Sequence, residues 1–362
     1  MAGLARRALS AAAVELPSAI AGKLAAQAAH IVRRNLLLTH EGIRLQRLLA
    51  AAGIPALILK GFAVAQLAYG SVETKQTLDL DFLVPPDQAE KALRILELEG
   101  FVLSAPAKHL SRAQRQALFR YGRDIDLIRP SQRLRIDLQW RAAYNPALLR
   151  GVSANSPAQA VTLSGSVTVR TLSSDDLFAY LCVHGAHHAW SRLKWLADLN
   201  AIVAADGTDV ERLYRHAQHL GAGLCAGQAL LLCQRLFGLN LPAPLATEIA
   251  AKRRAQRLVT IAMKAMTAPH ADTEHNDDVL AAAKIMHTQF LLGEGFSFYC
   301  AQLCGLAVGS ADVIRFPLPS ALHFLYPILR LPFWLWRRAY FQFADRDVAD
   351  HLSPARREAP RE

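Results

Sequence analysis

Residues 57–84 read LILKGFAVAQLAYGSVETKQTLDLDFLV, and this stretch decides the fold. It begins as a short apolar strand, turns at Lys60 and Gly61, continues as a short helix and a polar connection, and ends in a strand that carries two aspartates. Because successive side chains of a strand point to opposite faces, Asp79 and Asp81 share one face and the intervening apolar residues share the other. The pattern predicts one buried face and one face that presents two carboxylates.

These two carboxylates form a candidate metal site. Neighbouring carboxylates repel each other unless a cation lies between them or one of them holds a proton. Mg²⁺ prefers oxygen ligands and is often held by one or two carboxylates together with substrate phosphates. Asp79 and Asp81 match this donor set, and the alternative is an exposed strand end that the aspartates merely keep soluble.

Five segments of the chain carry a family resemblance. They are Leu59-Lys60-Gly61, Asp79-Leu80-Asp81-Phe82-Leu83-Val84, Ile136-Asp137-Leu138-Gln139-Trp140, the sequence LCVHGAHH at 181–188 and the sequence KWLAD at 194–198. In this combination the chain resembles the uncharacterised bacterial branch of the nucleotidyltransferase superfamily, which has the DNA polymerase β-like fold. The resemblance covers residues 35–205.

The resemblance implies a site and a reaction. Gly61 is expected to face a triphosphate, Asp79 and Asp81 to bind two Mg²⁺ ions with Mn²⁺ as a substitute, and Asp137 to complete the site. Lys60 is expected to offset phosphate charge. The implied enzyme moves a nucleoside monophosphate from a nucleoside triphosphate such as ATP to an acceptor hydroxyl that the sequence does not identify, and releases pyrophosphate.

Three positions depart from the family pattern. Phe62 follows the turn glycine where serine is usual, Lys75 stands where arginine is frequent, and Gln139 stands where histidine is frequent. Lys75 keeps the positive charge and is a candidate nucleotide-binding residue. The alternative function is a catalytically inactive relative that binds a nucleotide or a partner, including one at a membrane surface.

Residues 123–140 predict a β-hairpin with a rival to the third carboxylate. A turn centred between Ser131 and Gln132 places Asp126 directly opposite Asp137. Like charges in this position destabilise a sheet unless a cation relieves them. Asp126 is therefore the alternative to Asp137 as the third ligand.

The chain divides into four parts by its periodicity. Helical spacing precedes Gly53, strands alternate with helices after it, and a mostly helical pattern follows residue 173. We predict an α+β fold with N-terminal helices in 1–52, a small mixed-sheet nucleotidyltransferase domain in 53–145 and a mostly helical domain in 146–345. A short β pair is expected near 161–170, and 346–362 is expected to be a disordered tail.

A histidine cluster falls on a predicted helix. His184 and His188 lie one turn apart and share a face. Three interpretations are open: a metal site completed by Asp198, a packed core, or the acceptor site. The adjacent His-Asp pair of HD-type phosphohydrolases is absent, and we name His184 and His188 as candidate acceptor-site residues.

Charge and composition limit the partners and the location. The formal net charge of +11 favours anionic partners, but the basic residues are scattered, so nucleic acid is not expected. The aromatic, proline-interrupted stretch 316–343 does not predict a spanning helix and is a candidate contact with an anionic membrane surface. Five cysteines without a C-x-x-C pattern predict reduced thiols. We therefore expect a cytoplasmic protein, with peripheral attachment to the inner membrane face as the variant.

Overall fold

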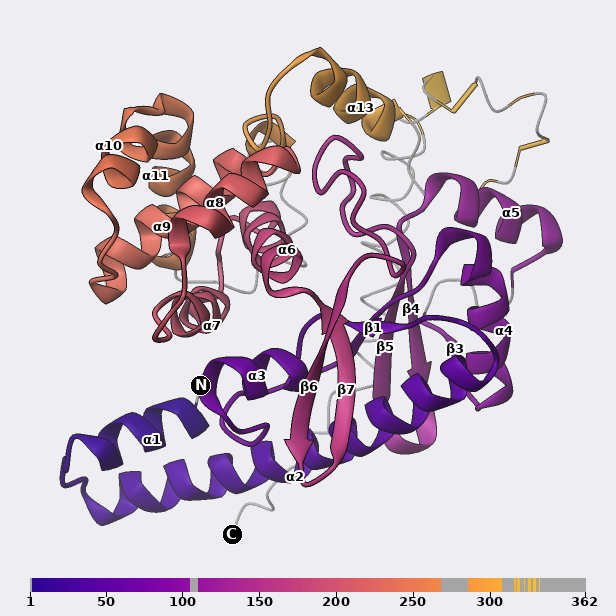
Figure 1. Cartoon of the computed structure of the whole chain (residues 1–362). Coiled ribbons are helices and arrows are strands. Elements are labelled where there is room, and N and C mark those ends of the chain that lie inside the picture. Colours follow the sequence, from indigo (N-terminus) through magenta and orange to yellow (C-terminus); the bar gives the residue numbers. More distant parts are fainter. Residues whose placement is uncertain are drawn as a thin grey trace, which may run out of the picture.

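The computed structural model describes residues 2–104, 110–267 and 286–307, and single positions between 316 and 332. A small sheet is flanked by a long helix on one face and a helical unit on the other (Figure 1). The predicted α+β class is confirmed. The candidate membrane stretch 316–343 lies mostly outside the described residues, and the predicted tail lies wholly outside them.

The main sheet has five strands. Their order is β1 (Leu57–Ile58), β2 (Leu80–Leu83), β5 (Leu134–Gln139), β4 (Asp124–Arg129) and β3 (Val102–Leu103). The central pair β2 and β5 is parallel, and the other neighbours are antiparallel. The predicted hairpin is confirmed, with the 3-10 turn η2 (Pro130–Gln132) between β4 and β5.

Helices cover the apolar face of this sheet. The 34-residue helix α2 (Ser18–Ala51) and helix α4 (Ala89–Leu98), which follows the short turn η1 (Pro86–Gln88), supply aliphatic side chains to one core. Helix α5 (Arg112–Tyr121) packs beside α4. The strand residues of this core alternate with the carboxylates, as the period of two predicts; they are Ile58, Leu80, Phe82, Leu127, Ile136 and Leu138.

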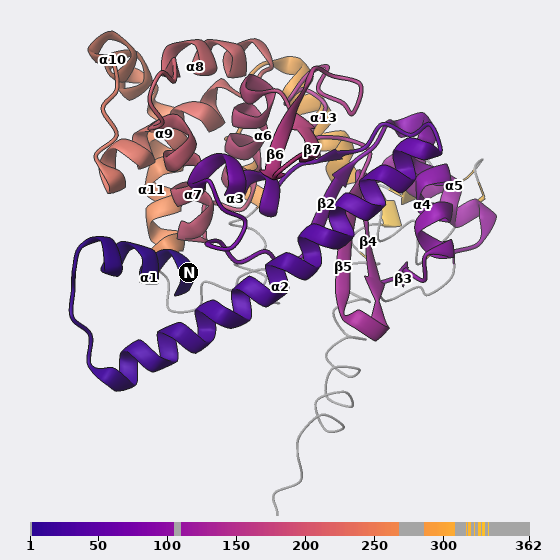
Figure 2. The same cartoon turned by 60° about the horizontal axis from the view of Figure 1, so that its bottom comes forward.

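The N-terminal helix lies beside the first part of α2, and its N-terminal end lies near the segment that leads to the candidate site. Helix α1 (Ala2–Ala11) packs on α2, and the N-terminus lies beside α3 (Phe62–Tyr69) (Figures 1 and 2). Arg7 Nη1 donates a hydrogen bond of 2.9 Å to the carbonyl of Tyr69. The amphipathic first helix therefore contacts the start of the connection that leads to β2.

A separate hairpin packs against the edge of the domain. It consists of β6 (Ala158–Ser164) and β7 (Val167–Leu172), corresponds to the β pair expected near 161–170, and contacts β1 and α3. The buried amide of Gln46 on α2 holds it in place. Its Nε2 donates to the carbonyls of Ala56 at 2.8 Å and Arg170 at 2.9 Å, and its Oε1 accepts from the Arg170 N–H at 3.0 Å.

The helical unit covers the carboxylate face. Helix α9 (Gly223–Phe237) lies at its centre and is surrounded by α6 (Ser174–His187), α7 (Leu193–Val203), α8 (Val210–His219), α10 (Ala243–Ala251) and α11 (Arg253–Thr267), with α13 (Phe296–Ala307) nearby. Leu57, Leu59 and Leu83 of the sheet domain join the core of this unit. The helical unit therefore covers part of the second face of the sheet, whereas Asp126 on β4 remains exposed.

Two further expectations concern cysteines and membrane spans. All five cysteines lie in described residues and carry free thiols, three of them buried. In the described ranges, none of the helices combines the length and the apolar character that crossing a bilayer requires.

Candidate active site

Three aspartates form a row across three adjacent strands. Asp81 on β2 lies opposite Asp137 on the parallel strand β5, and Asp137 lies opposite Asp126 on the antiparallel strand β4. Residues in register on neighbouring strands direct their side chains to the same face. The register therefore brings Asp81 together with both Asp137 and its predicted rival.

Two more carboxylates flank this row. Asp79 precedes β2 and lies within electrostatic reach of Asp81, and Asp124 is paired in register with Gln139. The sheet thus gathers acidic groups near one place from two parts that are distant in sequence, the β2 segment and the β4–β5 hairpin. The five aspartates of this acidic face are Asp79, Asp81, Asp124, Asp126 and Asp137.

Two donors lie on the central carboxylates. The ammonium Nζ of Lys60 is 2.8 Å from Asp81 Oδ1. The amide Nε2 of Gln139 donates to Asp137 Oδ2 at 2.6 Å and, more weakly, to the same Asp81 oxygen at 3.5 Å. Gln139 thus takes a bridging position between the two acids.

The orientation of the Gln139 amide is fixed by two donors on its other end. Its Oε1 accepts from Arg123 Nη1 at 3.2 Å and from the Tyr180 hydroxyl at 3.4 Å. Arg123 is also paired with the Asp124 carboxylate and lies 4.1 Å from the centre of the Tyr144 ring. Because both partners of Oε1 are donors, the N–H groups must face the carboxylates.

Burial and mutual repulsion disfavour the ionised carboxylates of the acidic face, and the nearby cations offset this only in part. Burial raises the pKa of Asp137 well above the usual value, Asp124 and Asp81 add to this, and Arg123 and Lys60 oppose it. Burial likewise raises the pKa of Asp81 against the opposing effect of Lys60. Asp126, at the end of the row, has an exposed side chain, so burial affects it less than the two central acids. An additional cation would relieve this repulsion.

The donor set fits Mg²⁺ that arrives with phosphate ligands. In the ranges that the structure describes, no three His, Cys, Asp or Glu side chains converge as a ready metal cluster. Mg²⁺ usually takes only one or two carboxylates, and phosphates and waters complete its octahedron. Asp81 and Asp137 provide two such oxygens on one face in direct register, and the shortage of positive charge favours a cation there.

Lys75 is committed to a buried ion pair. Its Nζ lies 2.7 Å from Asp198 Oδ2 on α7, and the Tyr69 hydroxyl donates to Asp198 Oδ1 at 2.9 Å. Lys75 and Asp198 are both buried. Asp198 is therefore occupied by Lys75 and Tyr69, which weighs against the metal site of histidines and Asp198 that the sequence left open.

Gly61 forms a turn that only glycine fits well. Its φ is +65°, and a Cβ at this position would lie 2.8 Å from Cγ2 of Thr77. Helix α3 starts at the next residue, and the first N–H groups of a helix lack intrahelical partners and favour anions. The turn therefore presents backbone donors beside Lys60.

Phe62 has a structural role that explains the missing serine. The residue is fully buried, and its ring lies so close to Gly42 of α2 that a Cβ there would be 2.7 Å from Phe62 Cε1. The aromatic ring thus packs α3 against α2. The polar groups at this turn are therefore the Lys60 ammonium and the backbone, without a side-chain hydroxyl at residue 62.

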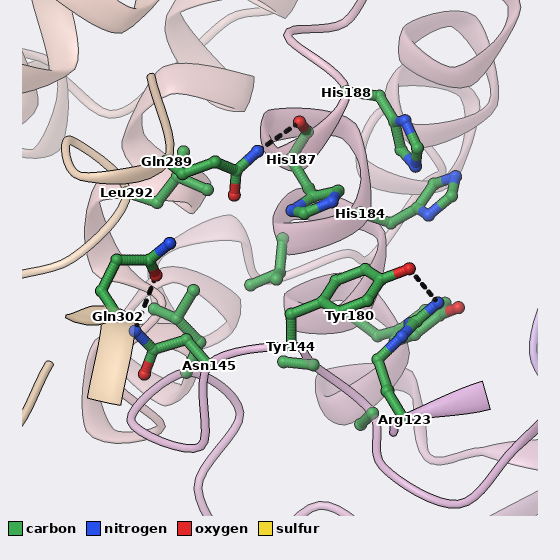
Figure 3. A pocket seen from close by; sticks show the side chains of 14 residues that line it. Arg123, Tyr144, Asn145, Tyr180, His184, His187, His188, Gln289, Leu292 and Gln302 are labelled. Atoms are coloured by element: carbon green, nitrogen blue, oxygen red, sulfur yellow. Dashed lines mark hydrogen bonds between the residues drawn. The ribbon is translucent and has the colours of Figure 1, made fainter. Parts of the chain in front are cut away.

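A small pocket adjoins the acidic face and contains the candidate histidines (Figure 3). Its volume is about 30 Å³, which suits a group of the size of one water molecule. Arg123 and Tyr180, which both bond to Gln139, form part of its wall. The other polar lining residues are Tyr144, Asn145, His184, His187, His188, Gln289 and Gln302.

The histidines of this pocket are neutral. Burial lowers the pKa of His187 to about 4 and that of His188 to about 3, and it lowers the pKa of His184 well below 6.5. Nearby cations, Arg123 above all at His187, act in the same direction. The buried Nε2 of His184 has no hydrogen-bond partner among the described residues, so it is available to a ligand.

The structure adds residues that sequence reasoning did not assign. Tyr180, Tyr144 and Arg123 organise Gln139 and the pocket. Lys194 forms no salt bridge in the described part of the chain and lies within electrostatic reach of Asp79 and Lys75. Its signal was its place at the head of the sequence KWLAD.

A mixed sheet with carboxylates in register, a glycine turn into a short helix and a helical unit over the acidic face define a protein of the nucleotidyltransferase class. The chain belongs to the family described as uncharacterised nucleotidyltransferase, whose model matches residues 1–238. The match extends from α1 through the end of α9. No curated protein matches the chain.

Proposed function

We propose that this chain is a Mg²⁺-dependent nucleotidyltransferase that moves a nucleoside monophosphate from a nucleoside triphosphate to an acceptor hydroxyl. The observation that carries the proposal is the register of Asp81 and Asp137 on adjacent parallel strands, beside the turn at Gly61. Family membership supports the same reaction class.

The triphosphate is assigned to the start of α3. The backbone N–H groups after Gly61 and the Lys60 ammonium offer donors and positive charge at one point. Lys75 and Lys194 add charge near Asp79, with Lys75 held by Asp198. Asp79, Asp81 and Asp137 would hold the metal ions, with Asp126 as the rival to Asp137.

The transfer step follows from these positions. The acceptor oxygen forms a bond to the α-phosphorus, the bond from the α-phosphorus to the oxygen bridging to the β-phosphate breaks, and pyrophosphate leaves with that electron pair. The Asp137 carboxylate takes the hydroxyl proton, and its raised pKa supports this role. Bound Mg²⁺ would neutralise charge on the phosphates and the attacking oxygen.

The pocket of His184 and His188 is assigned to the acceptor. Neutral imidazoles and amides can exchange hydrogen bonds with a hydroxyl without imposing charge on it. Gln139 connects this pocket to Asp137, since it bonds both to the pocket residues and to the carboxylate. The small volume suits the hydroxyl-bearing end of an acceptor, whose remainder would lie outside.

Calorimetric titration tests the proposal. The four nucleoside triphosphates are titrated with and without Mg²⁺ into wild type and into the double variant Asp79→Asn, Asp81→Asn. Binding that requires both the metal and the aspartates is the expected result. Nucleotide binding that persists in the double variant would favour the alternative, an inactive relative that binds nucleotide without the acidic site.

A further inference from the structure

Lys60 is built into the acidic face by the backbone. The N–H of Leu59 donates to the Asp81 carbonyl at 3.0 Å, which places the next side chain beside the Asp81 carboxylate. The Lys60 side chain is 17% exposed and that of Asp81 is 2% exposed. A lysine so enclosed with a carboxylate is held as an ion pair, not as a surface charge.

Lys60 faces acidic groups from several sides. Its Nζ lies 2.8 Å from Asp81 Oδ1, and Asp79, Asp137 and Tyr180 lie within electrostatic reach of it. The ammonium is thus the internal counter-ion of the acidic face. It neutralises part of the charge that a metal ion would otherwise neutralise.

The two donors use the carboxylate oxygens that a bridging ion would need. Lys60 Nζ takes Asp81 Oδ1, and Gln139 Nε2 takes Asp137 Oδ2 and approaches the same oxygen of Asp81. A divalent ion beside the ammonium would also meet like-charge repulsion. In this arrangement, metal entry requires Lys60 to leave Asp81.

The nucleotide provides the place for the displaced ammonium. Under the proposed function the triphosphate lies at the turn formed by Gly61, and Gly61 directly follows Lys60 in the chain. A side chain pivoting at this turn exchanges one carboxylate for phosphate oxygens, which are strong partners for an ammonium. The movement frees Asp81 at the moment when phosphate ligands for the metal arrive.

We propose that Lys60 is a latch on the carboxylate site: it closes Asp81 to divalent metal in the free protein, and nucleoside triphosphate opens the site by drawing the ammonium onto its phosphates. The inference rests on the proposed function and adds an order to it. Metal and nucleotide bind as a unit, and the free protein has low affinity for metal alone.

Electron paramagnetic resonance of Mn²⁺ tests the latch without a catalytic readout. Mn²⁺ is titrated into wild type and Lys60→Met in the absence of nucleotide. Removal of a charge-assisted hydrogen bond and of a competing cation is expected to tighten Mn²⁺ binding about tenfold or more. The same variant should bind Mn²⁺ with the non-hydrolysable α,β-methylene analogue of ATP about tenfold more weakly than wild type.

Two control variants separate the latch from general effects. Lys252→Met removes a lysine of the helical unit whose Nζ lies 3.4 Å from the Glu248 carboxylate. This variant should keep the wild-type affinity for Mn²⁺. The double variant Lys60→Met, Asp81→Asn should not show the tighter Mn²⁺ binding of Lys60→Met, because it lacks the Asp81 carboxylate that the metal would use. Circular dichroism establishes that each variant is folded.

A measurement on wild type decides the matter if Lys60→Met does not fold. With the ATP analogue present, wild type is expected to bind Mn²⁺ at least about tenfold more tightly than it does alone. Mn²⁺ bound to the free analogue is measured separately and subtracted. Two results would overturn the latch: equal Mn²⁺ affinity of wild type with and without the analogue, or unchanged Mn²⁺ affinity in folded Lys60→Met. In either case, nucleotide binding by wild type would still support the proposed function. Failure of wild type to bind nucleotide under any condition would instead overturn the function.

Discussion

The ammonium of Lys75 lies 2.7 Å from the carboxylate of Asp198, and the two buried groups join the connection before β2 to helix α7. The Tyr69 hydroxyl completes the arrangement with a hydrogen bond to the other Asp198 oxygen. A residue that the family resemblance made a candidate for nucleotide binding is thus also one of the links between the sheet domain and the helical unit. It joins the segment before Asp79 to α7, the helix that carries Lys194.

Breaking the link should destabilise the protein. Lys75→Met or Asp198→Asn leaves one buried charge without its partner, for which a loss of about 3–5 kcal/mol is typical. Urea unfolding monitored by circular dichroism measures it. Arg94→Met removes the exposed pair with Glu90 on α4 and should cause no measurable loss. Equal stability of all three variants would show that the buried pair contributes nothing.

Replacing Asp137 should stabilise the protein at neutral pH. Because burial, Asp124 and Asp81 raise the pKa of Asp137, the folded state binds a proton more tightly than the unfolded state does. The contribution of this group to stability is therefore full below the unfolded pKa of about 3.9 and is lost as pH rises through the folded pKa.

The test compares wild type and Asp137→Asn in EDTA. The variant is expected to be the more stable protein at pH 7, and the advantage should shrink as pH falls towards 4. Denaturant unfolding at both pH values measures the two differences. A variant that is less stable at pH 7 would show that the ionised carboxylate is well compensated in the fold.

The pocket histidines should make stability fall in mild acid. Because the pKa values of His187 and His188 are lowered in the folded state, these side chains bind protons in the unfolded chain at pH values where they stay neutral in the folded chain. Their contribution is present above pH of about 6.5 and is lost as pH falls towards the folded pKa values. Each such group adds a slope of up to about 1.4 kcal/mol per pH unit in that window.

His188→Gln isolates one of these slopes. Below pH of about 6.5 its free energy of unfolding should fall less steeply than that of wild type, by up to about 1.4 kcal/mol per pH unit. His219→Gln, at an exposed position of α8, is the matched control and should follow the wild-type curve. Coincident curves for all three proteins would mean that the His188 imidazole is not held neutral by burial.

Gly61 should tolerate alanine less well than Gly70 does. Both glycines have φ near +65°, where an L-residue is strained by about 1–2 kcal/mol. A Cβ at Gly70 would meet nothing within 4 Å, whereas one at Gly61 would lie 2.8 Å from Thr77. Thermal unfolding should show a loss of about 1 kcal/mol for Gly70→Ala and at least about 2 kcal/mol for Gly61→Ala. Equal losses would mean that Thr77 moves away at no cost.

The sequence by itself determined the strands, their alternation and the hairpin register. A period of two assigns Asp81 and Phe82 to opposite faces, and a short turn fixes which residues pair, so the pairing of Asp126 with Asp137 followed from counting. Local rules suffice here because chain connectivity leaves few alternatives. The motif at residues 79–84 indicated the family in the same way.

Only the tertiary structure decided which groups meet across the sheet and between its layers. The parallel pairing of β2 with β5 sets Asp81 against Asp137, and Gln139, Tyr180 and Lys60 then meet around them from separate elements. The commitment of Lys75 to Asp198 spans more than a hundred residues. Such contacts depend on how two hydrophobic cores pack against one sheet, and no local pattern in the chain encodes that packing.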